Sequence, residues 1–272
     1  MSVPHIADGL PIDWTPQLIA IDIDDTLTLH LGEMKPRVID AIAAVRARGV
    51  EVVLATGRAF DTTTPVARDA GIDGYVVCSN GAILGDVSRD KIIEAVTFDA
   101  GPVIKRLNEL VPGAVFAVED VHGVFYTTRM FSTGPLGLRI KEVSFEDLAK
   151  EPVVRLVMRS NQHTEEAFGE AAAQLGFHQV VYGVADVAWM DVGPHDVTKA
   201  SMLQEVCSRK GMRADRVIAI GDNWNDVPML EWAGLGVAMG SAVPQIQAKA
   251  NLITLAEPGD GAAAVLEAVA SR

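Results

Sequence analysis

The chain has 272 residues, of which 49% are hydrophobic and 22% are charged, as is typical of a globular protein with one large core or two smaller ones. Its formal net charge of −13 at pH 7 excludes a general affinity for nucleic acid or acidic membranes, because those partners need a basic face. There is no apolar run near the ~20 residues that cross a bilayer, no signal-peptide pattern at the start, and no Cys-x-x-Cys pair. We therefore expect a cytoplasmic protein.

The first part of the chain alternates between apolar runs and helical segments. The run before Asp22 consists of β-branched and other apolar residues, and it predicts a buried strand of a parallel sheet. Pro36 and Gly49 mark the start and the end of a predicted helix. This alternation is that of βαβ units, with helices on both faces of the sheet. Strands are predicted at residues 18–23, 51–55 and 74–78, and helices at residues 36–49 and through Ala67.

From about residue 84 the pattern changes. Two short apolar segments separated by Asp120-Val-His122 predict a β-hairpin, and further short strands flank a helical segment. The segment therefore predicts an antiparallel sheet with two helices. Its strands are predicted at residues 114–119, 123–128, 153–159, 179–182 and 187–191, with a helix at residues 164–175.

After Pro194 the first pattern returns. A helix opens at Lys199, a strand covers residues 216–220, and further short elements lead to a closing helix at residues 261–270. The fold class is therefore α/β: a doubly wound, Rossmann-like parallel-sheet core with an inserted α+β unit. The core is expected to comprise residues 1–83 and 193–272, and the inserted unit residues 84–192.

Polar residues follow the predicted core strands at the points where those strands end. The carboxyl ends of parallel strands share one edge of a sheet, so these residues are expected to form one site. Several carboxylates that converge there would repel one another without a cation, and Mg²⁺ is a hard ion that suits carboxylate and phosphate oxygens. The candidate residues at strand ends are Asp22, Asp24, Thr56, Gly57, Asp222, Asn225 and Asp226, and Lys199 at the start of a predicted helix is a further candidate.

The order of these residues resembles the four motifs of the haloacid dehalogenase-like phosphatases. The four motifs occur here in the same order as in the family, each beside the expected element: Asp-x-Asp-x-Thr26, Thr56, Lys199 and Gly-Asp-Asn-x-Asn-Asp226. Thr-Gly-Arg58 and Ser-Asn-Gly81 further resemble the Cof-type members, in which a type-2 cap is inserted between the second and third motifs. The resemblance covers nearly the whole chain from Gln17 onward.

The resemblance implies a Mg²⁺-dependent phosphatase that hydrolyses small phosphorylated metabolites, such as sugar phosphates, through an aspartyl-phosphate. Asp22 is then the nucleophile, and Asp24 is the general acid that protonates the leaving group. Thr56, the Gly57 amide, Lys199 and the Asn225 amide bind the phosphoryl group. The metal ligands are Asp22, the main-chain carbonyl of Asp24 and Asp222, with Asp226 behind them. Asp25 and Asp61 are expected to be structural or exposed to solvent.

Other functions remain open at this point. A signalling receiver domain also places an acidic pocket, a threonine and a lysine around Mg²⁺, but its first strand does not end in Asp-x-Asp and no cap follows. A phosphomutase of the same fold and a non-catalytic, metabolite-sensing member are two further candidates. The sequence does not name the substrate, which is expected to be small and phosphorylated, and it leaves the oligomeric state open.

Arg155 is a candidate for substrate selection. Alternation along the strand at residues 153–159 places Arg155, Val157 and Arg159 on the face opposite to the apolar one. The open face of the cap sheet is expected to close over the substrate. An arginine on that face suits recognition of a second carboxylate or phosphate group of the substrate. The competing interpretation is an arginine on a solvated face.

Overall fold

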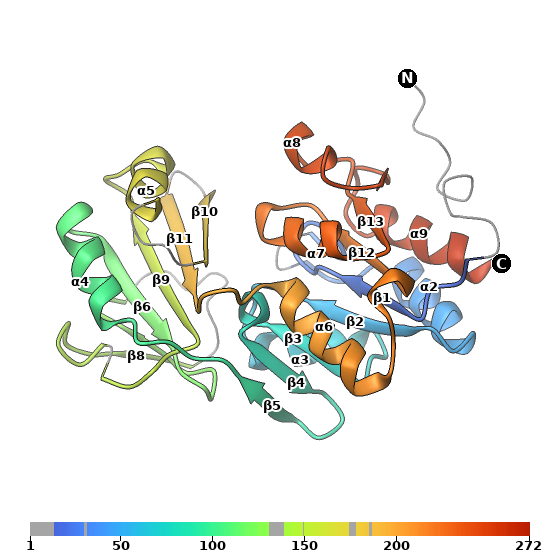
Figure 1. Cartoon of the computed structure of the whole chain (residues 1–272), viewed down its shortest axis with the longest axis horizontal. Coiled ribbons are helices and arrows are strands. Elements are labelled where there is room, and N and C mark those ends of the chain that lie inside the picture. Colours follow the sequence, from blue (N-terminus) through green and yellow to red (C-terminus); the bar gives the residue numbers. More distant parts are fainter. Residues whose placement is uncertain (1–13, 30–31, 131–138, 149, 174–177, 185–186) are drawn as a thin grey trace.

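The computed structural model describes residues 14–29, 32–130, 139–148, 150–173, 178–184 and 187–272, which form two lobes (Figure 1). The larger lobe contains both ends of the described chain. The smaller lobe is formed by the middle of the sequence and is joined to the larger one by the segments that follow β5 (Lys91–Ala95) and β11 (Val187–Gly193); Phe98 in the first of them forms a β-bridge with Val153 of the smaller lobe.

An eight-stranded sheet forms the centre of the larger lobe, in the order β14-β13-β12-β1-β2-β3-β4-β5. The central strand β1 pairs in parallel with β12 on one side and with β2 on the other. The last two strands, β4 and β5, are antiparallel. The strands are β1 Leu18–Ile21, β2 Glu51–Ala55, β3 Tyr75–Cys78, β4 Ile83–Asp86, β5 Lys91–Ala95, β12 Val217–Gly221, β13 Leu235–Ala238 and β14 Leu252–Ile253.

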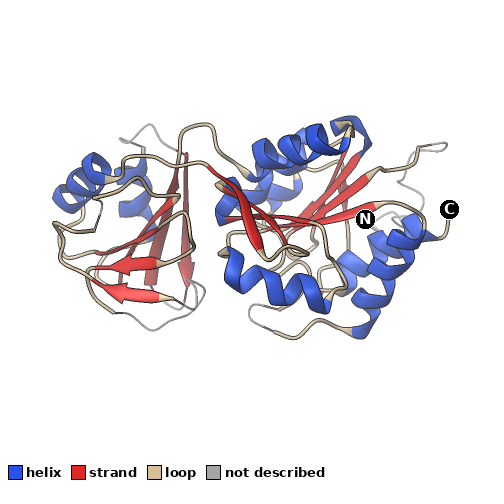
Figure 2. Ribbon diagram, turned by 90° about the horizontal axis from the view of Figure 1, so that it is seen from below, coloured by secondary structure: helices blue, strands red, loops and turns tan. Residues whose placement is uncertain are grey.

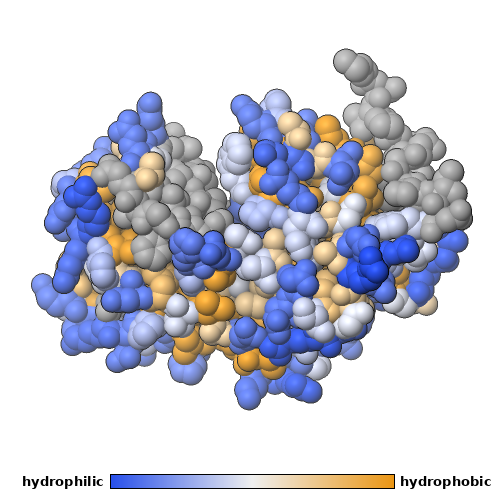
Figure 3. Space-filling view, viewed as in Figure 1, coloured by the Kyte–Doolittle hydropathy of each residue, from blue (hydrophilic) through white to orange (hydrophobic). Residues whose placement is uncertain are grey.

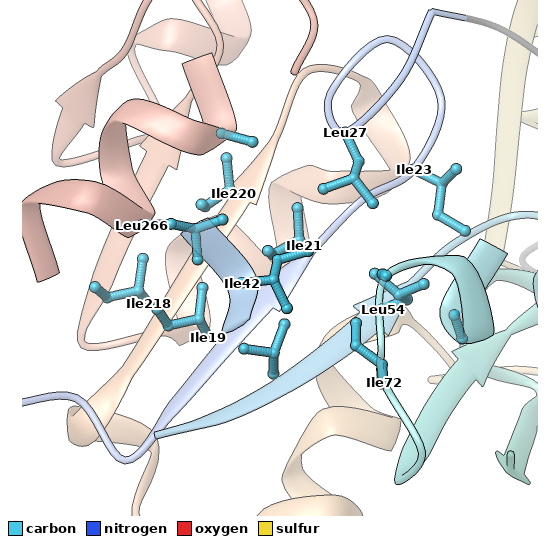
Figure 4. Close-up of a cluster of buried hydrophobic side chains, with 14 of the residues drawn as sticks. Ile19, Ile21, Ile23, Leu27, Ile42, Leu54, Ile72, Ile218, Ile220 and Leu266 are labelled. Carbon is cyan, nitrogen blue, oxygen red and sulfur yellow. The ribbon is translucent and has the colours of Figure 1, made fainter. Parts of the chain in front are cut away.

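Helices cover both faces of this sheet (Figure 2). All four residues of β1 are buried, and they alternate between the two apolar clusters, with Ile19 and Ile21 in one and Leu18 and Ala20 in the other. A strand buried on both faces needs a continuous apolar run, which is the pattern that predicted it. Figure 4 shows the first cluster, which includes Ile42. Its helices are α2 Pro36–Ala47, α3 Phe60–Asp69 and α9 Asp260–Ala270, and those opposite are α6 Lys199–Lys210, α7 Val227–Trp232 and α8 Pro244–Gln247.

The smaller lobe contains a six-stranded sheet with two helices on one face. Its strand order is β10-β11-β9-β6-β7-β8, and all neighbours are antiparallel except β7 and β8. Leu156 and Met158 of β9 pack on the helical side together with Phe168, as the alternation predicted. The elements are α4 Gly101–Leu110, β6 Val115–Glu119, β7 Phe125–Thr127, β8 Ile140–Glu142, β9 Arg155–Ser160, α5 Glu165–Ala172, β10 His178–Val184 and β11 Val187–Gly193.

The predicted fold class is thus confirmed, but one expected bound needs correction. Residue 84 lies inside β4, and both β4 and β5 pair with the large sheet instead of the small one. Leu84 is fully buried in the core cluster beneath α6. A tight antiparallel hairpin interrupts the βαβ pattern, and so does the start of an inserted unit. The two cannot be told apart from the sequence pattern, so the start of the inserted unit was predicted too early. We propose that the inserted unit, called the cap below, spans residues 96–192.

The surface of the described residues has the mixed polarity that the composition predicts. Within the described ranges no helix is both long enough and apolar enough to span a membrane. On the face shown in Figure 3, hydrophobic residues lie in small groups among hydrophilic ones. Large apolar side chains among the described residues are exposed at Leu29, Met130, Trp224, Val243 and Leu255.

Candidate active site

Three carboxylates meet at the carboxyl edge of the large sheet. Asp22 follows β1, and Asp222 and Asp226 follow the adjacent strand β12. One oxygen atom from each of the three side chains lies within 4.8 Å of the others. Burial and the neighbouring Asp226 raise the pKa of Asp22 well above its usual value, although Lys199 acts in the opposite direction. Burial and Asp226 likewise raise the pKa of Asp222 to about 7.

Lys199 is fully buried beside this cluster. It is the first residue of α6, whose start is fixed by a capping box between Thr198 and Ser201. Its Nζ atom donates to Oδ1 of Asp22 at 2.7 Å and to Oδ1 of Asp226 at 2.6 Å. Burial lowers the pKa of Lys199, but the two carboxylates outweigh burial and raise it, so the side chain stays charged. Lys199 is therefore a part of the site and not a surface lysine.

Asp226 holds the loop that follows β12. Its Oδ2 atom accepts hydrogen bonds from the backbone N–H groups of Asp222 at 2.9 Å and Asn223 at 3.0 Å, while Oδ1 accepts from Lys199. A Cβ atom at Gly221 would lie 2.5 Å from Cγ of Asp226, so only glycine fits before this loop. These contacts fix the loop that carries Asp222, and the role of Asp226 behind a metal ion stays a prediction.

Thr26 is a site residue that the sequence analysis quoted only as part of a motif. Its hydroxyl group is fully buried and donates to Oδ1 of Asp222 at 2.7 Å. The bond fixes the orientation of a carboxylate that is predicted to bind the metal. The sequence signal for this role was the position of Thr26 directly after the acidic residues that end the first predicted strand.

Asp24 lies apart from the three clustered carboxylates and pairs with Arg58. The guanidinium group binds both oxygens, with Nε to Oδ2 at 2.8 Å and Nη2 to Oδ1 at 2.6 Å. Such a two-point contact fixes the plane of the carboxylate. Arg58 is buried, and the side chain of Asp24 is partly exposed. The sequence analysis gave Arg58 no role of its own.

Thr56, Gly57 and Asn225 gather around Asn80. Thr56 is fully buried, and its hydroxyl group accepts from the backbone N–H of Arg58 at 3.1 Å in the turn before α3. Asn225 donates from Nδ2 to Oδ1 of Asn80 at 3.0 Å, and a Cβ atom at Gly57 would lie 3.1 Å from the same oxygen. The turn thus brings the residues predicted to bind the phosphoryl group close together, and their binding role stays a prediction.

The donor set fits Mg²⁺. Three carboxylates from two neighbouring loops lie within reach of one cation, and carboxylate oxygens are the ligands that Mg²⁺ prefers. When all three carboxylates are ionised, the ammonium group of Lys199 balances only one of their charges. A divalent cation would therefore relieve the remaining repulsion.

Asp25 and Asp61 lie outside this cluster. Asp25 is exposed and adopts a left-handed backbone conformation with a φ of 58°. Asp61 is partly buried at the start of α3, where its Oδ2 atom lies 3.6 Å from Nε of Arg139 in the cap. The expectation of a structural or exposed residue agrees with both positions.

Comparison with known proteins identifies the family. The model of the haloacid dehalogenase-like hydrolases matches residues 19–266. Pyridoxal phosphate phosphatase YbhA of Escherichia coli (strain K12) is 27% identical over 259 residues, which cover 88% of this chain and 93% of that protein. Stress response protein YhaX of Bacillus subtilis (strain 168) is 26% identical over 275 residues, with 92% of each chain covered.

Solved structures show the same fold. The subclass IIB sugar phosphatase BT4131 has a TM-score of 0.78 at 23% identity, and the match covers 92% of this chain and 98% of that one. SMU.1108c from Streptococcus mutans UA159 has a TM-score of 0.79 at 22% identity, covering 94% and 98%. The family match spans nearly the whole chain. Residues of the first, third and fourth motifs meet at one edge of the core sheet, and Thr56 of the second motif directly follows β2 of the same sheet. The chain therefore belongs to the haloacid dehalogenase-like hydrolases, as its motifs predicted.

Proposed function

We propose that this enzyme is a Mg²⁺-dependent phosphatase that hydrolyses small phosphorylated metabolites, sugar phosphates or similar, in the cytoplasm. The observation that carries the proposal is the buried contact of Asp22 with Lys199, beside Asp222 and Asp226. The proposal is supported by relatives that are named as phosphatases for pyridoxal phosphate and for phosphoglycolate. Both buried cysteines, Cys78 and Cys207, are free, as expected in a reducing compartment.

In this proposal Asp22 attacks the phosphoryl group and forms an aspartyl-phosphate, which water then hydrolyses. Lys199 holds positive charge against Asp22 and stabilises the negative charge that the phosphoryl oxygens bring. Mg²⁺, held by Asp22, Asp222 and the main chain at Asp24, would neutralise phosphate charge at the same place.

Asp24 and Arg58 are expected to act on the leaving group. Both Asp24 oxygens accept from Arg58, so the proton that Asp24 gives to the leaving oxygen requires this ion pair to open at least partly. A substrate oxygen that enters beside Arg58 would compete for the guanidinium group and release one carboxylate oxygen. This exchange would link the binding of the substrate to the release of the acid.

Asp24→Asn should reduce hydrolysis of alkyl phosphates much more than that of activated aryl phosphates. An alkoxide is a poor leaving group that needs a proton, whereas a nitrophenolate leaves without one, so the difference should reach roughly 10²-fold or more. The measurement is kcat/KM for both substrate types in the variant and the wild type. Equal losses for the two types would make Asp24 a structural or metal-binding residue instead of the acid.

Metal dependence and products test the proposed function as a whole. A panel of phosphorylated metabolites should identify at least one substrate that releases inorganic phosphate, and a chelator should remove this activity until Mg²⁺ is added again. A product that still contains the phosphoryl group at another position would indicate a phosphomutase. Binding of a metabolite without turnover by any member of the panel would indicate a metabolite-sensing protein.

A further inference from the structure

Arg155 lies at the junction between the cap and the core, where it is almost fully buried. Its guanidinium group donates from Nε to Oε2 of Glu119 at 3.0 Å and from Nη1 to Oδ2 of Asp191 at 3.1 Å. Nη1 also donates to the backbone carbonyl of Gly57 at 2.6 Å. The side chain is thus neither on a solvated face nor turned toward an open substrate pocket. It connects three cap strands to the turn of the second motif.

The two carboxylates that hold Arg155 also contact the core. Glu119 is fully buried and accepts a hydrogen bond from the hydroxyl group of Ser79 at 2.9 Å. Asp191 accepts from Nδ2 of Asn80 at 3.2 Å. Both core partners belong to the single turn η1, Ser79–Gly81, that follows β3. The cap therefore contacts the Ser79–Gly81 turn through two acidic side chains, while Arg155 holds both carboxylates and contacts Gly57.

This turn has a strained backbone. Ser79 has a φ of 50°, a left-handed conformation that serine rarely adopts, whereas the neighbouring Asn80, with a φ of 55°, is a residue type that tolerates it. Strain of this kind persists only where the surroundings fix it. Here the bonds from Glu119 and Asp191 supply that fixation from the cap side.

The same turn contacts the residues predicted to bind the phosphoryl group. Asn80 donates its backbone N–H to the carbonyl of Thr56 at 3.1 Å and accepts from the Asn225 side chain at 3.0 Å. At Gly81 a Cβ atom would lie 2.1 Å from the carbonyl oxygen of Thr198, directly before Lys199. The turn therefore lies against the second, third and fourth motifs at once.

We propose that Arg155, Glu119 and Asp191 form a docking latch through which the closed cap sets the Ser79–Gly81 turn and so positions Gly57 and Asn225 for the phosphoryl group. The proposal rests on the proposed phosphatase function. These three are positioning residues, because they act through Asn80 and Gly57 and not on the substrate. When the cap opens, the turn loses the contacts that hold its strain, and the phosphoryl site loses its alignment.

The ionic character of the latch supports a positioning role. Burial raises the pKa of Glu119, although Arg155 and Ser79 favour its ionised form. A buried ion pair often stabilises a protein no more than well-packed apolar residues of similar volume, whereas its charges need a defined geometry. This arrangement suits a contact between cap and core that has to form in one geometry and still be able to break.

The latch makes a different kinetic prediction from a substrate-binding arginine. If Arg155 bound the leaving group, Arg155→Met would raise KM for the physiological metabolite and leave a small aryl phosphate unaffected. If it positions Gly57 and Asn225, every substrate depends on it, because every substrate has the same phosphoryl group. We expect kcat for para-nitrophenyl phosphate to fall about tenfold or more, and the inhibition constant of inorganic phosphate to rise by a similar factor.

Arg139→Met is the matched control. It removes a cap–core ion pair as well, in which Nε of Arg139 lies 3.6 Å from Oδ2 of Asp61, but this pair does not touch the Ser79–Gly81 turn. Kinetics with para-nitrophenyl phosphate should stay within about twofold of the wild type. Asp191→Asn preserves shape and serves as the second latch variant. It should weaken inhibition by inorganic phosphate about threefold or more, whether or not Arg155→Met folds.

Two outcomes would overturn the latch. One is unchanged inhibition by inorganic phosphate in folded Arg155→Met or Asp191→Asn, even if their melting temperatures fall, since the residues would then be structural only. The other is an equal loss in Arg139→Met, which would mean that any cap contact has this effect. Failure of the proposed function is separate, because it would appear as a wild-type protein that hydrolyses no phosphate ester. Equilibrium binding of inorganic phosphate would still test the latch in that case.

Discussion

Asp22→Asn is expected to lower kcat by a factor on the order of 10³ or more, while the fold stays intact. The amide cannot attack phosphorus to form the acyl phosphate, and it removes one of the three carboxylates at the proposed metal site. Asparagine fills the same space and accepts the hydrogen bond from Lys199 through its oxygen, so the packing beneath β1 is preserved. The measurement is kcat with an aryl phosphate at saturating Mg²⁺, together with a thermal melt.

Asp25→Asn is the matched control for this experiment. It makes the same chemical change three residues along the chain, at an exposed side chain. Its left-handed φ of 58° suits asparagine, so neither strain nor loss of a ligand is introduced. Activity should stay within about threefold of the wild type. A verified Asp22→Asn protein with more than a small residual rate would falsify the assignment of the nucleophile.

The core of the site could be predicted because its residues follow a simple rule. A fully buried strand needs a continuous apolar run, and a parallel sheet places the ends of such runs at one edge. Asp22 and Asp222 follow two adjacent strands of this kind, so their proximity follows from topology alone. The buried contact of Lys199 with Asp22 required only that its helix start at the same edge.

The side-chain partners could not be predicted in the same way. Arg58 and Asp24 meet because two loops approach each other, and nothing in the spacing of 34 residues indicates it. Arg155 was expected on an open cap face, since alternation gives the face of a strand but not what covers that face. Its burial depends on the docking of the cap on the turn at Asn80, which is a tertiary contact.

The bounds of the cap illustrate a second limit. The hairpin of β4 and β5 carries the antiparallel pattern of the cap, yet it completes the edge of the core sheet. The local sequence pattern predicts that a strand is antiparallel. It does not predict which sheet the strand joins, because that depends on which neighbouring element buries its apolar side. Leu84 packs in the core cluster with residues of α6, more than 100 positions later in the sequence, and only the folded chain shows this contact.

Lys199→Met is expected to destabilise the protein strongly as well as to reduce turnover. Removal of one partner of a buried ion pair leaves the other charge uncompensated and typically costs about 3–5 kcal/mol. Here two carboxylates are affected, because Nζ lies 2.7 Å from Asp22 and 2.6 Å from Asp226 at a fully buried position. The measurement is the free energy of unfolding in urea at neutral pH without added metal.

Lys35→Met is the control that isolates the effect of burial. Lys35 has an equally short contact, 2.7 Å from Nζ to Oδ2 of Asp260, but its side chain is 40% exposed. Water and salt can replace its charge, so the loss of this pair should change stability far less. If both variants lose the same stability, contact distance and not burial determines the strength of these pairs, and Lys199 is not the counter-charge of the site. A much larger loss in Lys199→Met, partly recovered by Mg²⁺, would show that the clustered carboxylates need a cation.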